Sequence, residues 1–309
     1  MPVSRATIIR GPCVITGGGQ TFFTAGDARY VRSPKKLNVT VSGEVIERRT
    51  DYWDVALTFT PMCPFTQAYL DVLFPHNNPV RYASVFGGAT DKPWICHGLD
   101  GRKLTIANGY VSKMPQLMLS AGKLPFGEIT IRGIIANNAA PDDAGSIDAE
   151  GTETYSYPAP NPADFVTQNW TAAFGDADPW DALVLVDGLI VDFDFATIDD
   201  RSDDQGVMDV LYDNLTAFAK LTPKGITAAQ LRAQQDIEVP RGSSFAGGAA
   251  DLVLTGADGS VITLYQANVE DDASLEFGQK ERVGELTFRN SRRIDTGVLG
   301  SIFDIVAAS

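Results

Sequence analysis

Hydrophobic and polar residues alternate along several stretches of the chain, as they do in β-strands with one buried face. The alternation is clear in Leu37–Val45, in Val55–Thr60 and in Ala182–Ile198, where Asp192 and Asp194 stand between apolar residues. A side-chain period of two places the apolar residues on one side of a strand and the polar residues on the other. These stretches therefore predict strands with a core on one face and water on the other.

Three stretches predict helices instead. Phe65–Phe74 and Gly206–Leu221 carry apolar residues at intervals of three and four, which is the spacing of one helix face. Ile226–Gln235 predicts a short helix with Thr227 as its N-cap. The whole pattern predicts a mainly β chain with flanking helices.

A stretch of about forty residues occurs twice in the chain. Trp94–Gly133 and Asp251–Asn290 align when the Asp-Gly dipeptides at 100–101 and 258–259 are superposed, and both copies end in Glu-x-Thr-x-Arg. An Asp-Gly pair between apolar strands is a strong hairpin signal. Two copies at this separation predict a duplicated domain rather than a repeat array.

The duplication predicts four consecutive parts. These are a first domain at residues 1–145, a linker at 146–162, a second domain at 163–290 and a C-terminal tail at 291–309. The linker belongs to a stretch rich in alanine, aspartate, glycine, serine and proline, which is typical of connections between domains. The apolar residues of the tail can dock either on a sheet or on another subunit.

The two copies are predicted to correspond element by element. Ala182–Ile198 matches Leu37–Thr60, with the charged segment of the first copy cut short. Gly206–Leu221 matches the helix at Phe65–Phe74, so the helix at Ile226–Gln235 is an insertion in the second copy.

Glu44–Asp54 has the sequence EVIERRTDYWD and is rich in charged residues. It predicts the tip of a long hairpin between two strands. Such a tip either forms an arm that reaches a neighbouring subunit or is a solvated loop. The candidate contact residues for an inter-subunit arm are Glu47, Arg48, Arg49 and Asp51.

Charge is distributed unevenly along the chain, whose formal net charge is -14. Residues 1–150 carry 15 Lys and Arg against 13 Asp and Glu, whereas residues 151–309 carry 10 against 26. A protein that grips nucleic acid needs cationic side chains to displace counterions, so specific DNA binding is disfavoured. No apolar stretch is long enough to span a bilayer, and the N-terminus lacks the apolar core of a signal peptide. We therefore expect neither a membrane partner nor export.

Candidate chemistry is sparse. His76 and His97 have no Cys, Asp or Glu at metal-ligand spacing and are expected to be structural, and no Gly-x-Ser-x-Gly motif is present. Asp192 and Asp194 would lie about 7 Å apart on one strand face, which suits either a glycosidase pair or, in our preferred interpretation, a hydrophilic wall. The acidic stretch Asp199–Asp204 lacks the spacing of a calcium loop. The sequence predicts no enzyme, no cofactor and no metal.

Three segments resemble a known family. The opening GPCVITGGGQTFFTAGD and the later GEVIERRTDYWDVALTFTP resemble the start of a tail tube protein of long-tailed, siphovirus-like bacteriophages, and NWTAAFGDADPWDALVLVDGLIVDFDF resembles the second domain of duplicated forms. The resemblance covers most of residues 8–290. It implies two tandem tube domains, each a β-sandwich or half-barrel with one packed α-helix, whose sheets close into a β-barrel ring.

The resemblance also implies a function. Three chains would form a pseudo-hexameric ring, and stacked rings would form a tube through which DNA passes without specific binding. The partners would be the chain itself together with tape measure, tail terminator and distal tail proteins, within a virion assembled in the host cytoplasm. The polar strand faces then become candidates for an acidic bore that repels DNA phosphates, and the residues concerned are Glu128, Thr130, Asp192, Asp194, Glu285 and Thr287.

Other interpretations stay open at this point. A trimeric hub or distal tail protein with two tube domains would form a single ring, and a secretion-type tube would have the same architecture. A carbohydrate-binding or glycosidase β-domain would instead use Asp192 and Asp194 in chemistry.

Overall fold

The structure is a computed structural model. It describes residues 8–9, 13–42, 44–76, 81–85, 93–99, 101–135, 148–167, 169–176, 180–185, 188–202, 206–227, 229–231, 249–270, 275–277, 281–290, 294–295, 298–299 and 301–308. The elements of the first half are, in order, β1 (Ile8–Ile9), β2 (Cys13–Gly17), β3 (Gln20–Thr24), β4 (Ala28–Val41), β5 (Glu44–Phe59), β6 (Pro61–Met62), α1 (Gln67–Leu73), β7 (Trp94–Gly98), β8 (Arg102–Ile106), β9 (Gly109–Lys113), β10 (Leu117–Leu119), β11 (Ile129–Ile135) and β12 (Asp148–Thr152).

The second half has a similar succession of elements. These are η1 (Pro162–Phe165), β13 (Trp170–Phe174), β14 (Val184–Leu185), β15 (Leu189–Ser202), β16 (Gly206–Leu221), β17 (Pro223–Lys224), a helical turn at 229–231, β18 (Ala250–Gly256), β19 (Val261–Val269), β20 (Leu275–Phe277), β21 (Glu281–Val283), β22 (Leu286–Asn290), β23 (Ile294–Asp295), β24 (Val298–Leu299) and β25 (Phe303–Val306).

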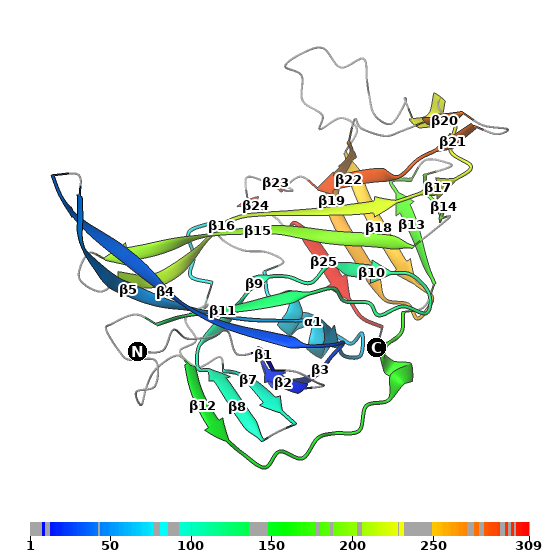
Figure 1. Cartoon of the computed structure of the whole chain (residues 1–309). Helices are drawn as coiled ribbons and strands as arrows, with labels where there is room; N and C mark the ends of the chain where they lie inside the picture. Colours follow the sequence, from blue (N-terminus) through cyan, green and yellow to red (C-terminus); the bar gives the residue numbers. More distant parts are fainter. Residues whose placement is uncertain are drawn as a thin grey trace.

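The long strands dominate the molecule (Figure 1). They belong to two sheets, with the strand orders β1-β4-β5-β11-β9 and β10-β15-β16-β22-β19-β18-β13. The remaining strands of the first half form a sheet with the order β12-β8-β7-β2-β3-β6, and α1 lies between this sheet and β11. The predicted mainly β class with flanking helices is confirmed, and the structure contains a sheet that curls into a half-barrel.

Aromatic side chains form the core of the first half. Phe22, Phe59 and Trp94 are almost fully buried, and the Phe22 ring centroid lies 6.3 Å from that of Phe59 and 5.9 Å from that of Trp94. Leu70 and Leu73 of α1 are buried as well. Because burial of one large apolar side chain contributes roughly 1.5–3 kcal/mol, tertiary packing rather than helix propensity holds this short helix.

The two halves repeat one strand topology. The Gly101 amide donates to the Gly98 carbonyl at 2.9 Å between β7 and β8, and the Gly259 amide donates to the Gly256 carbonyl at 2.9 Å between β18 and β19. Gly101 and Gly259 have φ values of 80° and 92°, a region that favours glycine. β2 pairs with β7 as β13 pairs with β18, and β5 pairs with β11 as β16 pairs with β22.

The long hairpins correspond residue by residue. β4 and β15 have 14 residues each, and β5 and β16 have 16 each. The strand pairing shifts at two bulges in each hairpin, at Ile46 and Asp51 in β5 and at Met208 and Asp213 in β16. The predicted shortening of the charged segment in the second copy is therefore wrong, because β15–β16 is as long as β4–β5.

Gly206–Leu221, predicted as a helix, is strand β16. The buried residues in its first part are Val207, Val210, Tyr212 and Leu215. A bulge adds one residue between neighbouring inward positions, so the bulges at Met208 and Asp213 turn two intervals of two into intervals of three. The residues whose spacing predicted the helix include Leu211, Leu215 and Phe218. They do not share one face of the strand, because Leu215 is buried whereas Leu211 and Phe218 are only partly buried.

The counterpart of α1 in the second half begins at Thr227. Thr66–Leu70 reads TQAYL and Thr227–Leu231 reads TAAQL, and each follows a Thr-Pro dipeptide at the end of a long hairpin. The Gln230 amide donates to Thr227 Oγ1 at 3.3 Å, and the Thr227 amide donates to Gln230 Oε1 at 2.9 Å, which forms a capping box. The predicted N-cap is confirmed. The helix is not an insertion, and residues 232–235 of the predicted helix lie outside the described residues.

Two predictions in the first half have different outcomes. The helix expected at 65–74 is α1. Glu44–Asp54 is not a hairpin tip, because it forms most of β5. The chain turns instead next to Ser42, whose φ is 52°.

Residues of the predicted linker and of the predicted tail both form edge strands. β12 pairs with β8 in the first half, and β25 pairs with β19 in the second half. β8 and β19 occupy equivalent places in the two halves, so β12 and β25 are equivalent edge strands. The predicted tail therefore docks on a sheet of its own chain.

In the part of the chain that the structure describes, no helix is long and apolar enough to cross a membrane.

Candidate assembly interface

The two halves are joined edge to edge by β10 and β15. β10 belongs to the first half and pairs antiparallel with the start of β15, in the register Leu117 with Val191, Met118 with Ile190 and Leu119 with Leu189. The first and third of these pairs are formed by buried side chains. Backbone hydrogen bonds and apolar burial together fix the register, so a sheet edge of one repeat is filled by a strand of the other.

A loop of the first half extends this junction along β16. Residues 81–85 form three backbone hydrogen bonds of 2.8–2.9 Å with β16. Arg81 Nη2 lies 2.9 Å from Asp213 Oδ1, and Ser84 Oγ donates to Asp209 Oδ1 at 2.8 Å. The loop therefore binds the part of β16 that lies between and beside its two bulges.

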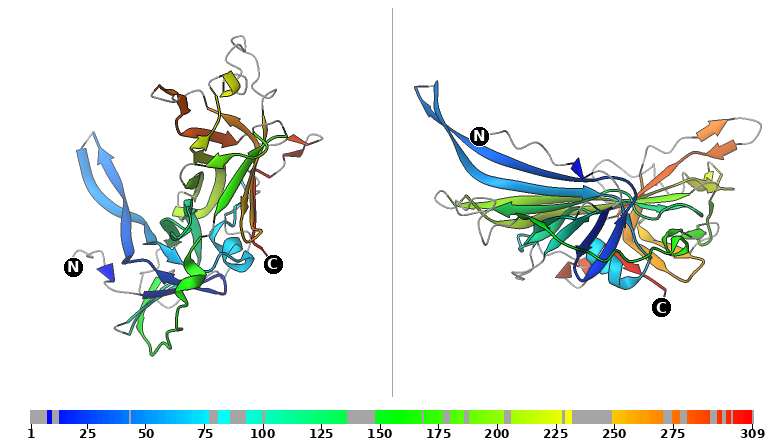
Figure 2. Two further views of the ribbon diagram at one scale, coloured as in Figure 1. Left: turned by 90° about the vertical axis from the view of Figure 1, so that its right-hand side faces the viewer. Right: turned by 60° about the horizontal axis from the view of Figure 1, so that its bottom comes forward.

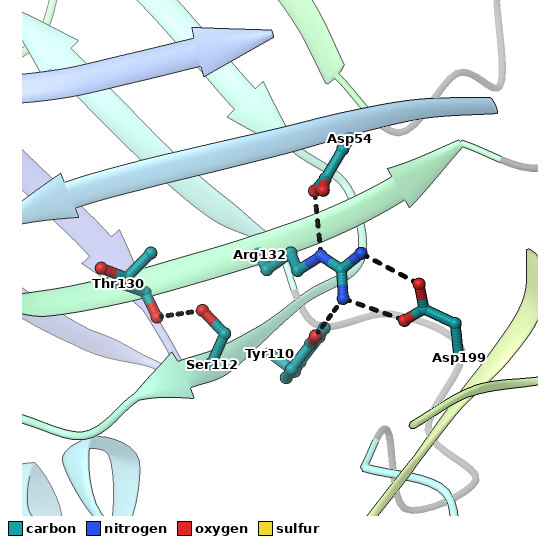
Figure 3. Close-up of polar contacts among 6 residues, drawn as sticks. All are labelled: Asp54, Tyr110, Ser112, Thr130, Arg132 and Asp199. Atoms are coloured by element: carbon teal, nitrogen blue, oxygen red, sulfur yellow. Dashed lines mark hydrogen bonds and ion pairs between the residues drawn. The ribbon is translucent and has the colours of Figure 1, made fainter. Parts of the chain in front are cut away.

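Arg132 ties three strands together at the junction (Figure 3). Its Nε donates to Asp54 of β5 at 2.9 Å, and its Nη1 and Nη2 donate to the two carboxylate oxygens of Asp199 of β15 at 3.0 and 3.3 Å. Nη1 also donates to the Tyr110 hydroxyl at 3.1 Å. The three charged side chains are each less than one-fifth exposed. The guanidinium thus bridges a carboxylate from each half of the chain.

The electrostatic environment favours a permanent cation at this place. Burial acts against the charged guanidinium, but the hydrogen bonds to Asp199 and Asp54 outweigh burial and raise the pKa of Arg132 above its usual range. Burial also raises the pKa of Tyr110, against the opposing effect of Arg132. The phenol therefore stays a neutral hydrogen-bonding group, and Arg132 is the cation between the two carboxylates.

The C-terminal strand adds a further contact between the halves. Gln67 of α1 accepts from the Ala307 amide at 3.0 Å and donates to the Ile305 carbonyl at 3.3 Å. The ring centroid of Phe303 lies 6.4 Å from that of Phe74 and 4.7 Å from that of Phe193. β25 therefore joins the helix of the first half to the sheet of the second.

Comparison with other proteins gives no family assignment. No family model matches the chain, and no curated protein matches its sequence. The function must therefore be argued from the fold and from this junction.

The residues predicted to line a bore share one kind of surface. They are Glu128, Thr130, Asp192, Asp194, Glu285 and Thr287, and none of them is buried. Their chain neighbours that are buried include Ile129, Ile131, Val191, Phe193, Leu286 and Phe288. Successive side chains of a strand point to opposite faces, so the six polar residues lie on the face turned away from the core.

This polar face continues across the junction. Lys113 Nζ lies 3.3 Å from Glu128 Oε1, and Gln116 Nε2 donates to Asp192 Oδ2 at 3.1 Å. A groove of about 400 Å³ runs between the halves here, and its lining includes Ser112, Lys113, Asp192, Asp194 and Phe218. The polar faces of the two repeats thus meet in one surface.

The predicted arm residues lie on the β4–β5 hairpin, which projects from the body of the molecule (Figure 1). Glu47 is exposed, and the side chains of Arg48, Arg49 and Asp51 are outside the described residues. The bulges align this part of β5 with the part of β16 that binds residues 81–85. The arm therefore repeats a surface that is already an interface in the second half.

The residues weighed for catalysis or metal binding have other contacts. His97 Nε2 lies 3.1 Å from Thr16 Oγ1, and the His97 ring stacks on Tyr155 at 3.9 Å between centroids. Asp199, from the acidic stretch, binds Arg132. Among the described residues no group of His, Cys, Asp and Glu could hold a metal ion, and Asp203 and Asp204 fall outside that description.

Sequence reasoning missed Arg132 and Asp199 as contact residues. Arg132 ends the repeated Glu-x-Thr-x-Arg motif, which signalled its position on the last strand but not its partner. Asp199 stands in an acidic stretch whose composition pointed only to calcium. The pairing depends on how the second half is placed against the first, and no local pattern encodes that placement.

Gly188 allows the close approach of β10 and β15, and its replacement gives a first prediction. A Cβ at this position would lie 1.4 Å from Ser120 Oγ, 2.6 Å from its Cβ and 3.3 Å from its Cα. Gly188→Ala is expected to lower the free energy of unfolding by about 1–3 kcal/mol, the usual cost of overpacking, as measured by urea denaturation. The double variant Gly188→Ala with Ser120→Gly should recover most of the loss. Equal stability of the single and double variants would contradict the close contact.

Proposed function

We propose that this chain is the structural subunit of a tail tube and assembles by adding copies edge to edge. The observation that carries the proposal is the β10–β15 junction, in which one repeat fills the sheet edge of the other. The two repeats share their topology, so the contact formed within the chain can be repeated between chains. Repeated heterologous contacts close into rings when the rotation per contact permits. Three copies would supply the six repeats that the tail-tube resemblance implies.

The polar face of the long-strand sheets suits the wall of a bore. Its acidic members include Glu128, Asp192, Asp194 and Glu285, none of which is buried. Negative charge along a channel repels DNA phosphates, so a duplex would slide without specific contacts. The opposite face packs on the core and is closed to solvent. The proposal includes tape measure, tail terminator and distal tail proteins as partners, and a place in the virion.

Ring closure would also cover the strand edges that a single chain leaves open. An exposed strand edge is a template for uncontrolled pairing with other chains. A ring in which each edge meets its counterpart leaves no such template. The arm on β4–β5 would then contact the next copy in the way that β15–β16 contacts the first half.

Electron microscopy of the concentrated protein, with light scattering for mass, tests the proposal. We expect rings or tubes whose density shows three chains per ring, with Asp192 and Asp194 facing the bore. A chain that stays monomeric at all concentrations would overturn the proposal. Polysaccharide hydrolysis that is abolished by Asp192→Asn would favour a glycosidase domain instead.

A further inference from the structure

The outer edge of β4 is equivalent to the edge of β15 that β10 fills. The matching bulges of the two long hairpins align Ala28, Arg29 and Tyr30 with residues 189–191. Ala28 and Tyr30 are buried and Arg29 is exposed, which matches the burial of Leu189 and Val191. The first half therefore offers a second copy of the surface that receives β10.

The strand that matches β10 is β20. Leu117 bridges to Phe126 in the first half, and Leu275 pairs with Val283 in the second, so both strands belong to equivalent hairpins. Within the described residues, β20 pairs with β21 alone. The β20–β21 hairpin lies at the far end of the molecule from the β4–β5 tip in Figure 1 and in the right-hand view of Figure 2, and Ala28–Tyr30 lie at the base of the β4–β5 hairpin, at the opposite end of β4 from that tip. One chain therefore has both a donor strand, β20, and an acceptor edge, on β4.

β1 occupies part of the acceptor edge in the isolated chain. Ile8 pairs with Arg29 and Ile9 pairs with Ala28, which are two of the three positions that the β10-type contact uses. A three-residue strand such as β20 would pair with all three positions.

We propose that β20 of a second copy replaces β1 on the edge of β4, with Leu275 opposite Tyr30, Glu276 opposite Arg29 and Phe277 opposite Ala28. This inference rests on the proposed function and specifies its inter-chain contact. The partner is a second copy of this chain, added in the register of the internal junction.

Charge distinguishes the contact between chains from the contact within the chain. The central pair of the internal junction is Met118 with Ile190, whereas the central pair between chains is Glu276 with Arg29. The Met118 amide donates to the Pro125 carbonyl, on the side away from β15, so this is a non-hydrogen-bonded pair, in which side chains approach closely. Opposite charges there favour the correct pairing, and β10, which lacks a carboxylate, is the poorer partner for β4.

Disulfide trapping in the full-length chain tests the register. The variant Arg29→Cys with Glu276→Cys is assembled and oxidised, and we expect covalent trimers, because Cα atoms of directly opposed residues lie within disulfide range. The native Cys13, Cys63 and Cys96 are buried and so do not compete. Ser33→Cys with Glu276→Cys is the matched control, because Ser33 lies four residues along the same face, about 13 Å away.

The outcomes separate the contact from the function. Assembly without cross-linking at position 29, or cross-linking at position 33 instead, overturns the contact and leaves the tube function standing. Failure of the wild-type chain to assemble overturns both.

A reversible lock tests the exchange of strands. Oxidised Ile8→Cys with Arg29→Cys holds β1 on β4, and we expect the concentration at which assembly begins to rise at least about tenfold. Reduction should restore the original value. Equal assembly of the oxidised and reduced forms would show that β1 does not compete with β20.

Discussion

Replacing Arg132 by leucine is expected to lower the free energy of unfolding by about 2–3 kcal/mol. The guanidinium binds Asp54 and Asp199 at 2.9–3.3 Å, in a site where each side chain is less than one-fifth exposed. Its removal leaves two carboxylates facing each other without a cation. Because the site is partly hydrated, the loss should fall below that of a fully buried pair. Urea denaturation measures the effect.

Two control variants separate this cluster from general charge effects. Arg289 occupies the same place in the second half, but it is 56% exposed and lies 2.5 Å from Glu270. Arg289→Leu should therefore cost less than about 1 kcal/mol, as exposed pairs do. Arg132→Lys keeps the charge and loses the two-pronged contact with Asp199, so its stability should lie between those of wild type and leucine. Equal losses at positions 132 and 289 would refute a special role for the junction cluster.

Shortening the β4–β5 hairpin is expected to leave the monomer folded and to raise the concentration needed for assembly about a hundredfold. The deletion removes Lys36–Val39 together with Glu47–Thr50, which are the four facing pairs between the two bulges. Removing facing pairs preserves the register of the remaining strand. The arm surface is the equivalent of the β16 surface that binds residues 81–85, so its loss should weaken contacts between chains. Light scattering measures assembly, and thermal unfolding measures the monomer.

The same deletion in the second hairpin is the matched control. Removing Thr197–Asp200 together with Asp209–Tyr212 takes away Asp199 and the strand that binds residues 81–85. This variant should lose monomer stability, because its hairpin is used within the chain. In the second half, the sequence counterparts of Arg81 and Ser84, which bind β16, are Arg241 and Ser244 with the same Arg-x-x-Ser spacing. These two residues lie outside the described residues, and in the proposal they belong to the segment that would bind the arm of the next copy. Normal assembly of the first variant would remove the arm from the proposed interface.

The repeat and the buried face of Val55–Thr60 could be inferred from the sequence. The Asp-Gly turns, the alternation in Val55–Thr60 and the Thr227 cap are local signals, because each depends on the backbone geometry of a few neighbouring residues. The same reasoning failed in β16, which contains two bulges. One extra residue in a strand shifts the phase of its apolar pattern, and the bulge itself depends on the opposite strand.

The sequence by itself therefore determined a duplicated, mainly β chain with an acidic second half and polar strand faces. Only the tertiary structure decided that β10 crosses to β15, that β25 returns to α1 and that Arg132 bridges Asp54 and Asp199. Strand edges pair through backbone groups that every residue except proline possesses. Side-chain patterns therefore mark which face of a strand is buried, whereas the neighbour of each edge is fixed only when the whole chain has packed.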